Sequence, residues 1–403
     1  MYIPLFDTKE PGKNDGLKKN FIYYFIRKGA STIADIARES DLSIPTVTKI
    51  LAEMLQEGLI VECGKSENSG TRKATLFNIK SDLCYFMGID IRQSSILVAV
   101  TDFAGKQVFA KECLGYKISA NADELPAALE IIDSVFDEMP VDRTQILRLG
   151  IALPGKIDIK QGISNSYLYK EGLVLADVFE ERYGIPTRID NDTRAMCYGE
   201  YMCGIGNGEL DVVYVNMSWG LGMSLITEGR PYYGRSGFSG EWGHINAFDN
   251  EILCYCGKKG CLETEVSGRA IHRQLLEKYK NGCSTILSDK INRGETLTLE
   301  DILDAIKKDD ILSIELVESA GRLLGKHIAG LLNIFNPELI ILGGIVGGIG
   351  DYLAFPVKTG IMKYTLNYVN NDTQLKVAVL GRQAGAVGSC MLVRSRCLGV
   401  IAF

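Results

Sequence analysis

The stretch SGEWGHINAFDNEILCYCGKKGCLE, residues 239–263, concentrates metal-binding side chains as no other part of the chain does. It holds one of only three histidines, His244, and three of the eleven cysteines, Cys254, Cys256 and Cys261. Three interpretations are open: a metal site, a disulfide knot, or free buried cysteines. The other cysteines are scattered and the total is odd, which is typical of a reducing compartment and disfavours disulfides. The spacing therefore favours a metal site.

Zn²⁺ suits this ligand set best. Thiolate and imidazole ligands in a tetrahedral arrangement are typical of zinc. The Cys-x-Cys pair and the turns at Gly257 and Gly260 let three sulfur atoms converge from one short loop. Four protein ligands leave no open coordination position, so we expect a structural zinc, held by His244, Cys254, Cys256 and Cys261.

Composition places this site in a globular protein. The chain has 403 residues, enough for two or three domains, and 46% of them are hydrophobic against 23% charged. No apolar run reaches membrane-spanning length, and the first residues lack the basic and apolar segments of a signal peptide. We expect a soluble cytoplasmic protein with no membrane partner.

The first 80 residues differ in charge from the rest. They carry 12 Lys and Arg against 10 Asp and Glu, whereas the whole chain has a net charge of −6. Apolar periodicity predicts a helix that begins at Leu17 and ends at Gly29, with Leu17, Phe21, Tyr24 and Phe25 inward. Thr32 and Ser43 are expected to cap two further helices. The third would bury Val47, Leu51, Met54 and Leu55. Two short strands follow around a polar tip.

Three helices followed by a hairpin resemble a winged helix-turn-helix domain. In such domains the third helix enters the major groove with its amino end toward the bases. The residues that this places at DNA are Ser43, Thr46, Thr48 and Lys49 on the helix, with Arg72 and Lys73 on the wing. A small trihelical domain that binds proteins is the alternative, but the basic wing tip favours DNA.

The remaining residues alternate between strand and helix patterns, which predicts an α/β architecture. Strand, turn and strand patterns begin near Asp90 and again near Gly220. This repetition suggests two related lobes.

Residues 84–403 resemble the ROK family (repressor, open reading frame, kinase). SGEWGH matches its glutamate-x-glycine-histidine motif, CYCGKKGCLE its cysteine-rich motif, and IDNDTRA its Asn-Asp motif. The resemblance implies a two-lobed actin-like (ribonuclease-H-like) ATPase fold behind the winged helix. The expected domains are 1–80 for DNA binding, 81–190 for the first lobe with 380–403 returning to it as a helix, and 191–379 for the second lobe with the zinc knuckle.

The resemblance also implies a sugar site. The positions that match the family's sugar-binding residues are Asn191, Asp192, Glu241, His244 and Glu263. His244 would bind zinc through one ring nitrogen and face a sugar hydroxyl through the other. In the family's kinases, the aspartate that matches Asp192 is the general base for phosphoryl transfer.

The two ATP-phosphate loops depart from the family pattern. The first reads Asp-x-Gly-Gly-Thr in the kinases, but Arg92 and Gln93 replace its glycines here. The second reads Gly-Thr-Gly-x-Gly, but Trp219 replaces its threonine, and side chains at these points should obstruct a nucleotide. The stretch 342–350, LGGIVGGIG, still resembles the adenosine-side loop.

Two functions follow from these departures. The first is a sugar-responsive transcriptional regulator that represses genes of carbohydrate catabolism and is not a kinase. It would bind operator DNA as a homodimer or homotetramer, with a sugar or sugar phosphate between its lobes. The alternative is an ATP-dependent, glucokinase-like sugar kinase with Asp192 as its base.

Overall fold

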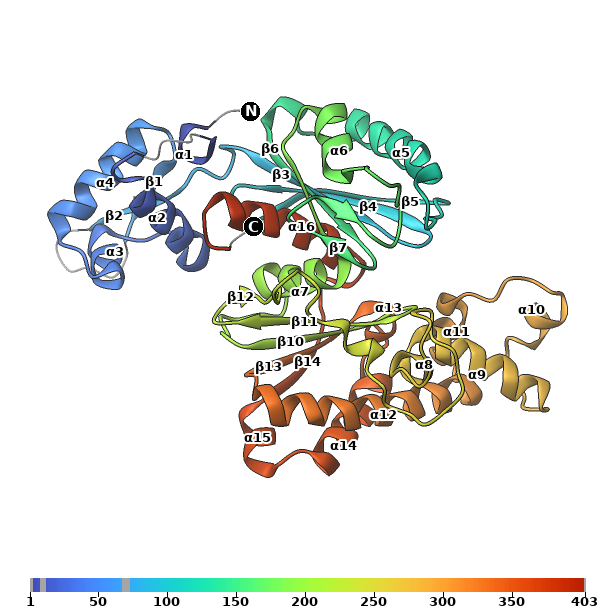
Figure 1. Ribbon diagram of the computed structural model, residues 1–403. Helices are drawn as coiled ribbons and strands as arrows, with labels where there is room; N and C mark the ends of the chain where they lie inside the picture. Colours follow the sequence, from blue (N-terminus) through green and yellow to red (C-terminus); the bar gives the residue numbers. More distant parts are fainter. Residues whose placement is uncertain (1–2, 8–11, 67–72, 402–403) are drawn as a thin grey trace. The chain divides into compact units, whose positions relative to one another are not determined.

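The computed structural model describes residues 3–7, 12–66 and 73–401. The chain divides into two compact units, residues 1–195 with 385–403, and residues 196–384 (Figure 1). Both units contain a five-stranded sheet, and the first also contains the amino-terminal helical module. In the described part of the chain, no helix is both long and apolar enough to cross a bilayer.

The amino-terminal module has the elements of a winged helix. Helices α2, α3 and α4 are followed by the antiparallel pair β1 and β2. Their bounds, with those of the short preceding helix, are α1 Pro4–Asp7, α2 Asp15–Lys28, α3 Ile33–Ser40, α4 Ile44–Gln56, β1 Ile60–Lys65 and β2 Thr75–Ile79. Both predicted caps are confirmed: the side chains of Thr32 and Ser43 accept hydrogen bonds from the backbone of Asp35 and Thr46.

The predicted inner face of α2 was partly wrong. Phe21 and Phe25 are buried as expected, but Leu17 and Tyr24 are only half-buried, and Ile22 and Lys18 are buried instead. The Lys18 ammonium lies 2.6 Å from a Glu57 carboxylate oxygen, so its aliphatic stem packs inside while its charge stays paired. Partners 39 residues away cannot be read from the periodicity of one helix.

The third helix needs a smaller correction of the same kind. Val47, Leu51 and Met54 of α4 are buried as predicted. Ile50 is buried with them, whereas Leu55 is only half-buried. Positions 47, 50, 51 and 54 form the regular apolar stripe of an amphipathic helix, with position 50 in place of the predicted position 55.

The sheet of the first unit has the strand order β5-β4-β3-β6-β9. Strands β3, β4 and β5 form an antiparallel meander; β6 pairs with β3 in parallel, and β9 pairs with β6 in parallel. The elements of this unit are β3 Tyr85–Ile91, β4 Ser95–Asp102, β5 Gln107–Leu114, η1 Ala122–Glu124, α5 Leu125–Glu138, η2 Arg143–Gln145, β6 Ile146–Leu153, β7 Ile157–Asp158, β8 Ile163–Ser164, α6 Leu175–Tyr183, β9 Thr187–Asn191 and α16 Ala384–Cys397, with α7 Asp192–Cys203 leading into the second unit.

The second unit repeats this topology in its sheet, β12-β11-β10-β13-β14. An antiparallel meander is again extended by two parallel strands, which confirms the prediction of two related lobes. The elements are β10 Val212–Met217, β11 Leu221–Thr227, β12 Arg230–Pro231, η3 Glu241–His244, α8 Glu263–Val266, α9 Gly268–Lys280, α10 Ser288–Asn292, α11 Leu299–Ile306, α12 Ile311–Phe335, β13 Leu339–Gly343, α13 Gly344–Gly347, α14 Asp351–Tyr364, α15 Asn367–Asp372, β14 Gln374–Val377 and η4 Gly381–Gln383.

Helix α16 packs directly against the first sheet because two glycines face it. A Cβ atom on Gly88 of β3 would lie 1.9 Å from the Ala386 carbonyl oxygen, and one on Gly150 of β6 would lie 2.5 Å from that of Ser389. The backbone of α16 therefore sits closer to these strands than any side chain would allow.

We expect Gly88→Ala to destabilise the protein by about 1–3 kcal/mol or more, because backbone atoms of α16 must move to accept the methyl group. Thermal unfolding followed by circular dichroism measures this as a lower Tm. Gly16→Ala is the matched control, since that glycine is helical and has no atom within 4 Å of an added Cβ. An unchanged Tm for Gly88→Ala would contradict the close packing of α16.

Candidate functional site

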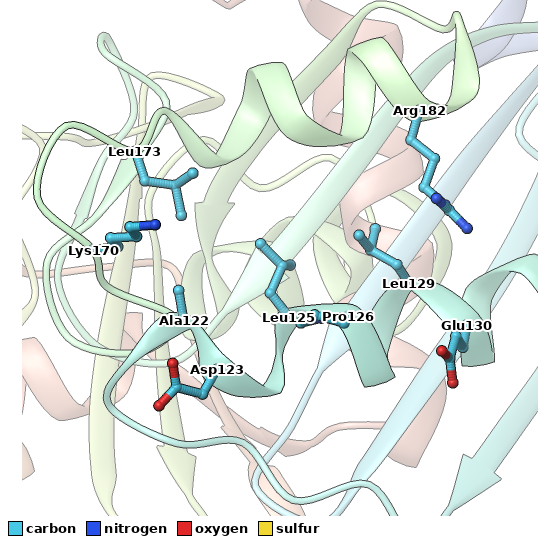
Figure 2. Close-up of a pocket in the computed structure, with 9 residues that line it drawn as sticks. All are labelled: Ala122, Asp123, Leu125, Pro126, Leu129, Glu130, Lys170, Leu173 and Arg182. Carbon is cyan, nitrogen blue, oxygen red and sulfur yellow. The ribbon is translucent and has the colours of Figure 1, made fainter.

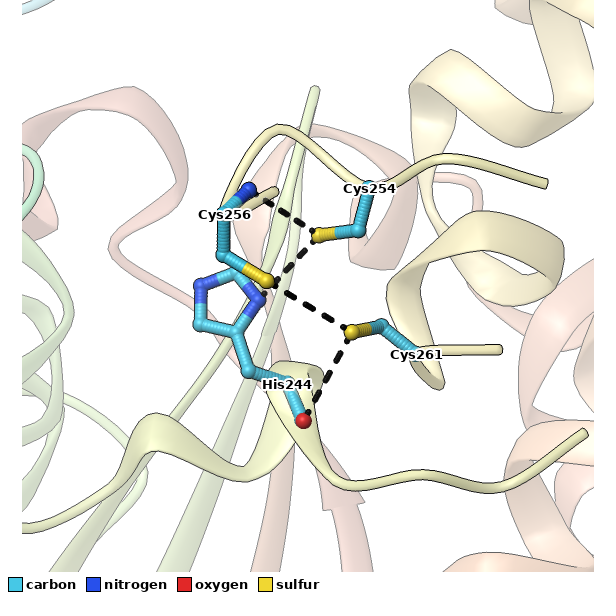
Figure 3. A group of neighbouring side chains, drawn as sticks. All are labelled: His244, Cys254, Cys256 and Cys261. Atoms are coloured by element: carbon cyan, nitrogen blue, oxygen red, sulfur yellow. Dashed lines mark hydrogen bonds between the residues drawn. The ribbon is translucent and has the colours of Figure 1, made fainter. Parts of the chain in front are cut away.

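The four predicted metal ligands come together in the second unit. One ligand atom from each of His244, Cys254, Cys256 and Cys261 lies within 4.8 Å of all the others (Figure 3). His244 Nδ1 is 3.4 Å from Cys254 Sγ, and Cys256 Sγ is 3.6 Å from Cys261 Sγ. This arrangement can hold a metal ion, as the sequence spacing predicted.

The loop that carries these ligands is shaped by two turns. Gly257 and Gly260 both have positive φ, 84° and 70°. A Cβ on Gly260 would lie 2.1 Å from the Phe248 carbonyl oxygen. Burial, helped by the Glu263 carboxylate that accepts from Cys254, raises the pKa of the Cys254 thiol. A cation beside the sulfur would be needed to favour its thiolate.

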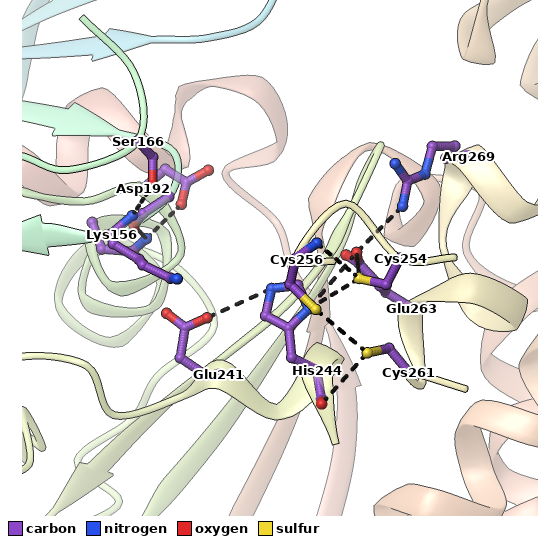
Figure 4. A network of polar contacts seen from close by, with 12 residues as sticks. Lys156, Ser166, Asp192, Glu241, His244, Cys254, Cys256, Cys261, Glu263 and Arg269 are labelled. Carbon is purple, nitrogen blue, oxygen red and sulfur yellow. Dashed lines mark hydrogen bonds and ion pairs between the residues drawn. The ribbon is translucent and has the colours of Figure 1, made fainter. Parts of the chain in front are cut away.

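The two ring nitrogens of His244 face different groups. Nδ1 points to the cysteines, whereas Nε2 lies 3.7 Å from a Glu241 carboxylate oxygen (Figure 4). Glu263 contacts the metal ligands as well, because its Oε1 lies 2.9 Å from Cys254 Sγ. Three of the predicted sugar-binding residues, Glu241, His244 and Glu263, are thus brought together around the metal ligands.

Arg269 also belongs to this group, although none of the sequence motifs includes it. Its Nη2 lies 3.3 Å from Oε1 of Glu263, whose side chain is only 9% exposed (Figure 4). Ser267, which lies between them in the sequence, caps α9 by accepting a hydrogen bond from the backbone N–H of Ala270. An acidic and a basic residue six positions apart, with a helix cap between them, is the signal that the sequence offered.

Asn191 and Asp192 lie together in the first unit, at the junction of β9 and α7. Asn191 Nδ2 donates to Asp192 Oδ1 at 3.0 Å and to the Gly155 carbonyl at 3.1 Å. Lys156, which follows Gly155 in the chain, donates its backbone N–H to Ser166 Oγ at 3.0 Å (Figure 4). The carboxyl ends of β6 and β9 therefore form one polar edge, with an amide and a carboxylate available to a ligand.

The carboxyl group of Asp192 has a raised pKa, close to neutral pH. Burial and the nearby Asp90 carboxylate raise its pKa to about 7. The backbone N–H of Thr193, which donates to Asp192 Oδ1 at 2.6 Å, and the charge of Arg92 act in the opposite direction. Desolvation is the largest of these causes.

The Arg92 side chain lies between two carboxylates of the first sheet, those of Asp90 and Glu112. Its Nε donates to Asp90 Oδ2 at 2.7 Å, and its Nη1 lies 3.7 Å from Glu112 Oε1. The Arg92 side chain is 14% exposed and that of Asp90 is fully buried. Ser95, across the hairpin turn, also donates to Glu112, at 2.9 Å. A packed ion-pair network therefore occupies the turn between β3 and β4.

Comparisons with known proteins agree with this architecture. The ROK family model matches residues 86–396, and a model described as winged helix-turn-helix DNA-binding matches residues 22–61.

The chain belongs to the ROK family.

Three similar proteins cover most of the ROK chain. The xylose repressor of Caldicellulosiruptor bescii is 27% identical over 363 residues, which is 89% of this chain and 90% of that one. The crystal structure of a ROK family transcriptional regulator, a homologue of the E. coli MLC protein, has a TM-score of 0.78 at 27% identity, covering 95% of this chain and 96% of that one. A ROK glucokinase from Streptomyces griseus with glucose and AMPPNP has a TM-score of 0.67 at 26% identity, covering 76% and 98%.

The second departure from the ROK kinase pattern is also built into the structure. Trp219 packs against the core of the second unit, and its ring lies 5.5 Å from that of His272. The carbonyl oxygens of Ser218 and Trp219 accept the backbone N–H groups of Gly268 and Arg269 at the start of α9. This loop is thus tied to a helix end by its backbone.

The predicted DNA-binding residues of α4 share one exposed surface. Ser43, Thr46, Thr48 and Lys49 are all exposed, and Val47 between them is buried. Thr48 Oγ1 donates to the Ile44 carbonyl at 2.8 Å, and the hydroxyls of Ser43 and Thr46 are 2.8 Å apart. On the wing, Lys73 is exposed, whereas Arg72 lies outside the described residues. DNA contact by all six stays a prediction.

One surface hollow lies apart from these groups. It has a volume of about 340 Å³ and is lined by residues of η1, α5, α6 and the segment before α6 (Figure 2). Its apolar floor includes Leu125, Leu129 and Leu173, and Lys170 and Arg182 lie at its edge. None of the predicted sugar, metal or DNA residues lines it, so we assign the site to the polar groups above.

We expect the purified protein to carry one tightly bound metal ion per chain, and Cys256→Ser to lose it, because the hydroxyl is a poor substitute for a thiolate ligand. Inductively coupled plasma mass spectrometry measures the metal content. Cys283→Ser is the matched control, since Cys283 is exposed and outside the cluster. Equal metal content in Cys256→Ser and wild type would contradict the assigned ligands.

We expect Asp192→Asn to raise Tm at pH 8 by at least about 2–4 °C, the change that ~1 kcal/mol gives in a domain of this size, and to have little effect near pH 4. The folded-state pKa of about 7 is above the ordinary value for an aspartate. The carboxyl group therefore lowers stability progressively from about pH 4 to pH 7, and fully above it.

Differential scanning calorimetry at both pH values tests this sign. The exposed Asp82→Asn variant is the control for the same chemical change elsewhere. A stabilisation by Asp192→Asn that is greater at pH 4 than at pH 8 would contradict the raised pKa.

Proposed function

We propose that this ROK protein is a sugar-responsive, DNA-binding transcriptional regulator that represses genes of carbohydrate catabolism. Its relatives include a protein named as a xylose repressor and a solved ROK transcriptional regulator, and they span the same winged helix and ROK regions. Residues 1–80 would read operator DNA. Residues 81–190 with 380–403, and 191–379, would form the two lobes that bind the sugar. We propose a cytoplasmic location, which a DNA-binding role supports.

The Arg92 network is the observation that carries this proposal. A kinase must bring ATP phosphates against the backbone of the β3–β4 turn, and catalysis there depends on positioning and charge neutralisation. Here the guanidinium is held by Asp90 and Glu112, and a nucleotide would have to break both contacts. The sugar-facing residues Asn191, Asp192, Glu241, His244 and Glu263 keep the donors and acceptors that hydroxyl groups need.

We propose Zn²⁺ as the metal of the His-Cys₃ cluster. Zn–S bonds of about 2.3 Å in a tetrahedron place sulfur atoms roughly 3.8 Å apart. The 3.6 Å between Cys256 Sγ and Cys261 Sγ is close to that value. With four protein ligands the ion would be structural, and it would fix the loop that presents His244 Nε2 and Glu263 to the sugar.

A homodimer or homotetramer is the expected assembly. Winged helix and helix-turn-helix proteins commonly read two half-sites related by a two-fold axis, one per recognition helix. Each chain here offers one exposed α4 surface. Two copies would therefore be needed to read a palindromic operator.

We expect the protein to bind labelled DNA from its own upstream region, and one sugar of a panel of D-xylose, D-glucose and N-acetyl-D-glucosamine to weaken binding about tenfold. Fluorescence anisotropy at fixed salt measures both. Lys49→Ala should weaken DNA binding and reduce the salt dependence by about one ion, whereas Lys308→Ala, an exposed lysine of the second unit, should not.

The kinase alternative is tested with the same preparation. Coupled detection of ADP in the presence of ATP, Mg²⁺ and each sugar should show no turnover above background. Sugar phosphorylation by the wild-type protein that Asp192→Asn abolishes would overturn the regulator proposal in favour of a kinase. Absence of DNA binding under every condition would contradict the role of residues 1–80.

A further inference from the structure

The short segment that precedes the DNA-binding module is anchored on the first lobe. In residues 3–7, which we name the N-terminal clip, Ile3 and Leu5 are 6% and 7% exposed. The Phe6 ring lies 5.8 Å from that of Phe103 in the lobe. Asp7 forms an ion pair with Arg148 of β6, and neither side chain is more than 17% exposed. A half-buried ion pair beside an aromatic contact is a specific attachment.

The clip also contacts the module itself. The ammonium of Lys19 in α2 lies 5.9 Å from the centre of the Phe6 ring, within the range of a cation–π interaction. Burial raises the pKa of the Cys397 thiol at the end of α16, and the charges of Arg148, Asp7 and Lys19 act on it as well. The clip, helix α2 and the end of α16 therefore meet at one place.

The clip contacts β6 through Arg148 and β3 through Phe103, and both strands end near the predicted sugar-binding residues Asn191 and Asp192. Arg148 is near the amino end of β6, and the loop that follows β6 contains Gly155, whose carbonyl accepts from Asn191. Phe103 stacks on Phe86, near the amino end of β3, and β3 carries Asp90 near its other end. Because strands rise about 3.3 Å per residue, Arg148 and the end of β6 are roughly 17 Å apart along one rigid element.

Helix α16 makes a second connection between these places. Asp190, which is 3% exposed, pairs with Arg194 of α7 at 2.5 Å and with Arg396 of α16 at 2.7 Å. Arg394 of the same helix donates to the Phe103 carbonyl at 3.4 Å. The paired charges of Asp190 and Arg396 would thus resist a movement at the start of α7. Through α16 they are connected to Phe103, the residue that the clip contacts.

We propose that the N-terminal clip couples the sugar-binding state of the first lobe to the DNA-binding module. This inference rests on the proposed function. The clip contacts would hold the module in its ligand-free position, and sugar binding would weaken them through β6, β3 and α16. A ligand changes DNA binding only if it binds two states of the protein with different affinities. In this proposal the clip contacts link those states to the position of the module, so a protein without them loses the link. Sugar would still bind, but DNA binding would no longer respond to it.

The test compares wild type with the double variant Phe6→Ala, Asp7→Asn. Anisotropy gives the operator Kd with and without the panel sugar that acts most strongly on wild type, and calorimetry gives the Kd of that sugar. We expect the sugar to change the operator Kd about tenfold for wild type and less than about twofold for the variant. The variant should bind the sugar with an equal or lower Kd, because binding no longer has to weaken the clip contacts.

Two further variants make the result specific to the clip. Asp7→Arg with Arg148→Asp reverses the ion pair and should retain a larger sugar response than either single reversal. Glu39→Gln removes an exposed ion pair with Lys28 inside the module and should keep the full response. A tenfold response in Phe6→Ala, Asp7→Asn would overturn the clip proposal. A wild-type protein that binds DNA but responds to no panel sugar would overturn the proposed function instead.

Discussion

The imidazole of His244 is shared between two groups, and the candidate site depends on that sharing. Its Nδ1 lies 3.4 Å from a cysteine sulfur and its Nε2 lies 3.7 Å from Glu241. The ring is rigid, so a ligand that fixes one nitrogen also fixes the direction of the other. Under our proposal, zinc on one side orders the hydrogen-bonding group on the other. The proposed sugar site could thus be kept in a loop with little regular structure.

Under our proposal, side chains occupy the part of the fold that would bind a nucleotide in the family's kinases. Arg92 stands where the family pattern has a glycine, and it pairs with Oδ2 of Asp90, a fully buried carboxylate that would be costly without a cationic partner. Trp219 contributes apolar surface to the core of the second unit. Both side chains contact other parts of the protein and occupy space that a ligand would otherwise need. This fits a sensor, in which sugar binding need only shift an equilibrium between two states.

Local patterns in the sequence predicted local structure well. The caps at Thr32 and Ser43 depend on residues three positions away, and the metal cluster depends on a span of 18 residues from His244 to Cys261. Contacts between distant residues were not predictable in this way. The buried Lys18 has partners 39 residues away, and Asp190 pairs with Arg396 across 206 residues. Arg92 was expected to obstruct a nucleotide, but its contact with Glu112 depends on the register of β4 and β5.

The dependence of sugar binding on the metal cluster tests this account most directly. Isothermal titration calorimetry would compare the affinity of the active panel sugar for wild type and for Cys256→Ser, with circular dichroism to verify that both are folded. The account predicts that loss of the metal weakens sugar binding at least about tenfold, since His244 and Glu263 are no longer held in place. Equal affinity for a folded, metal-free variant would contradict it.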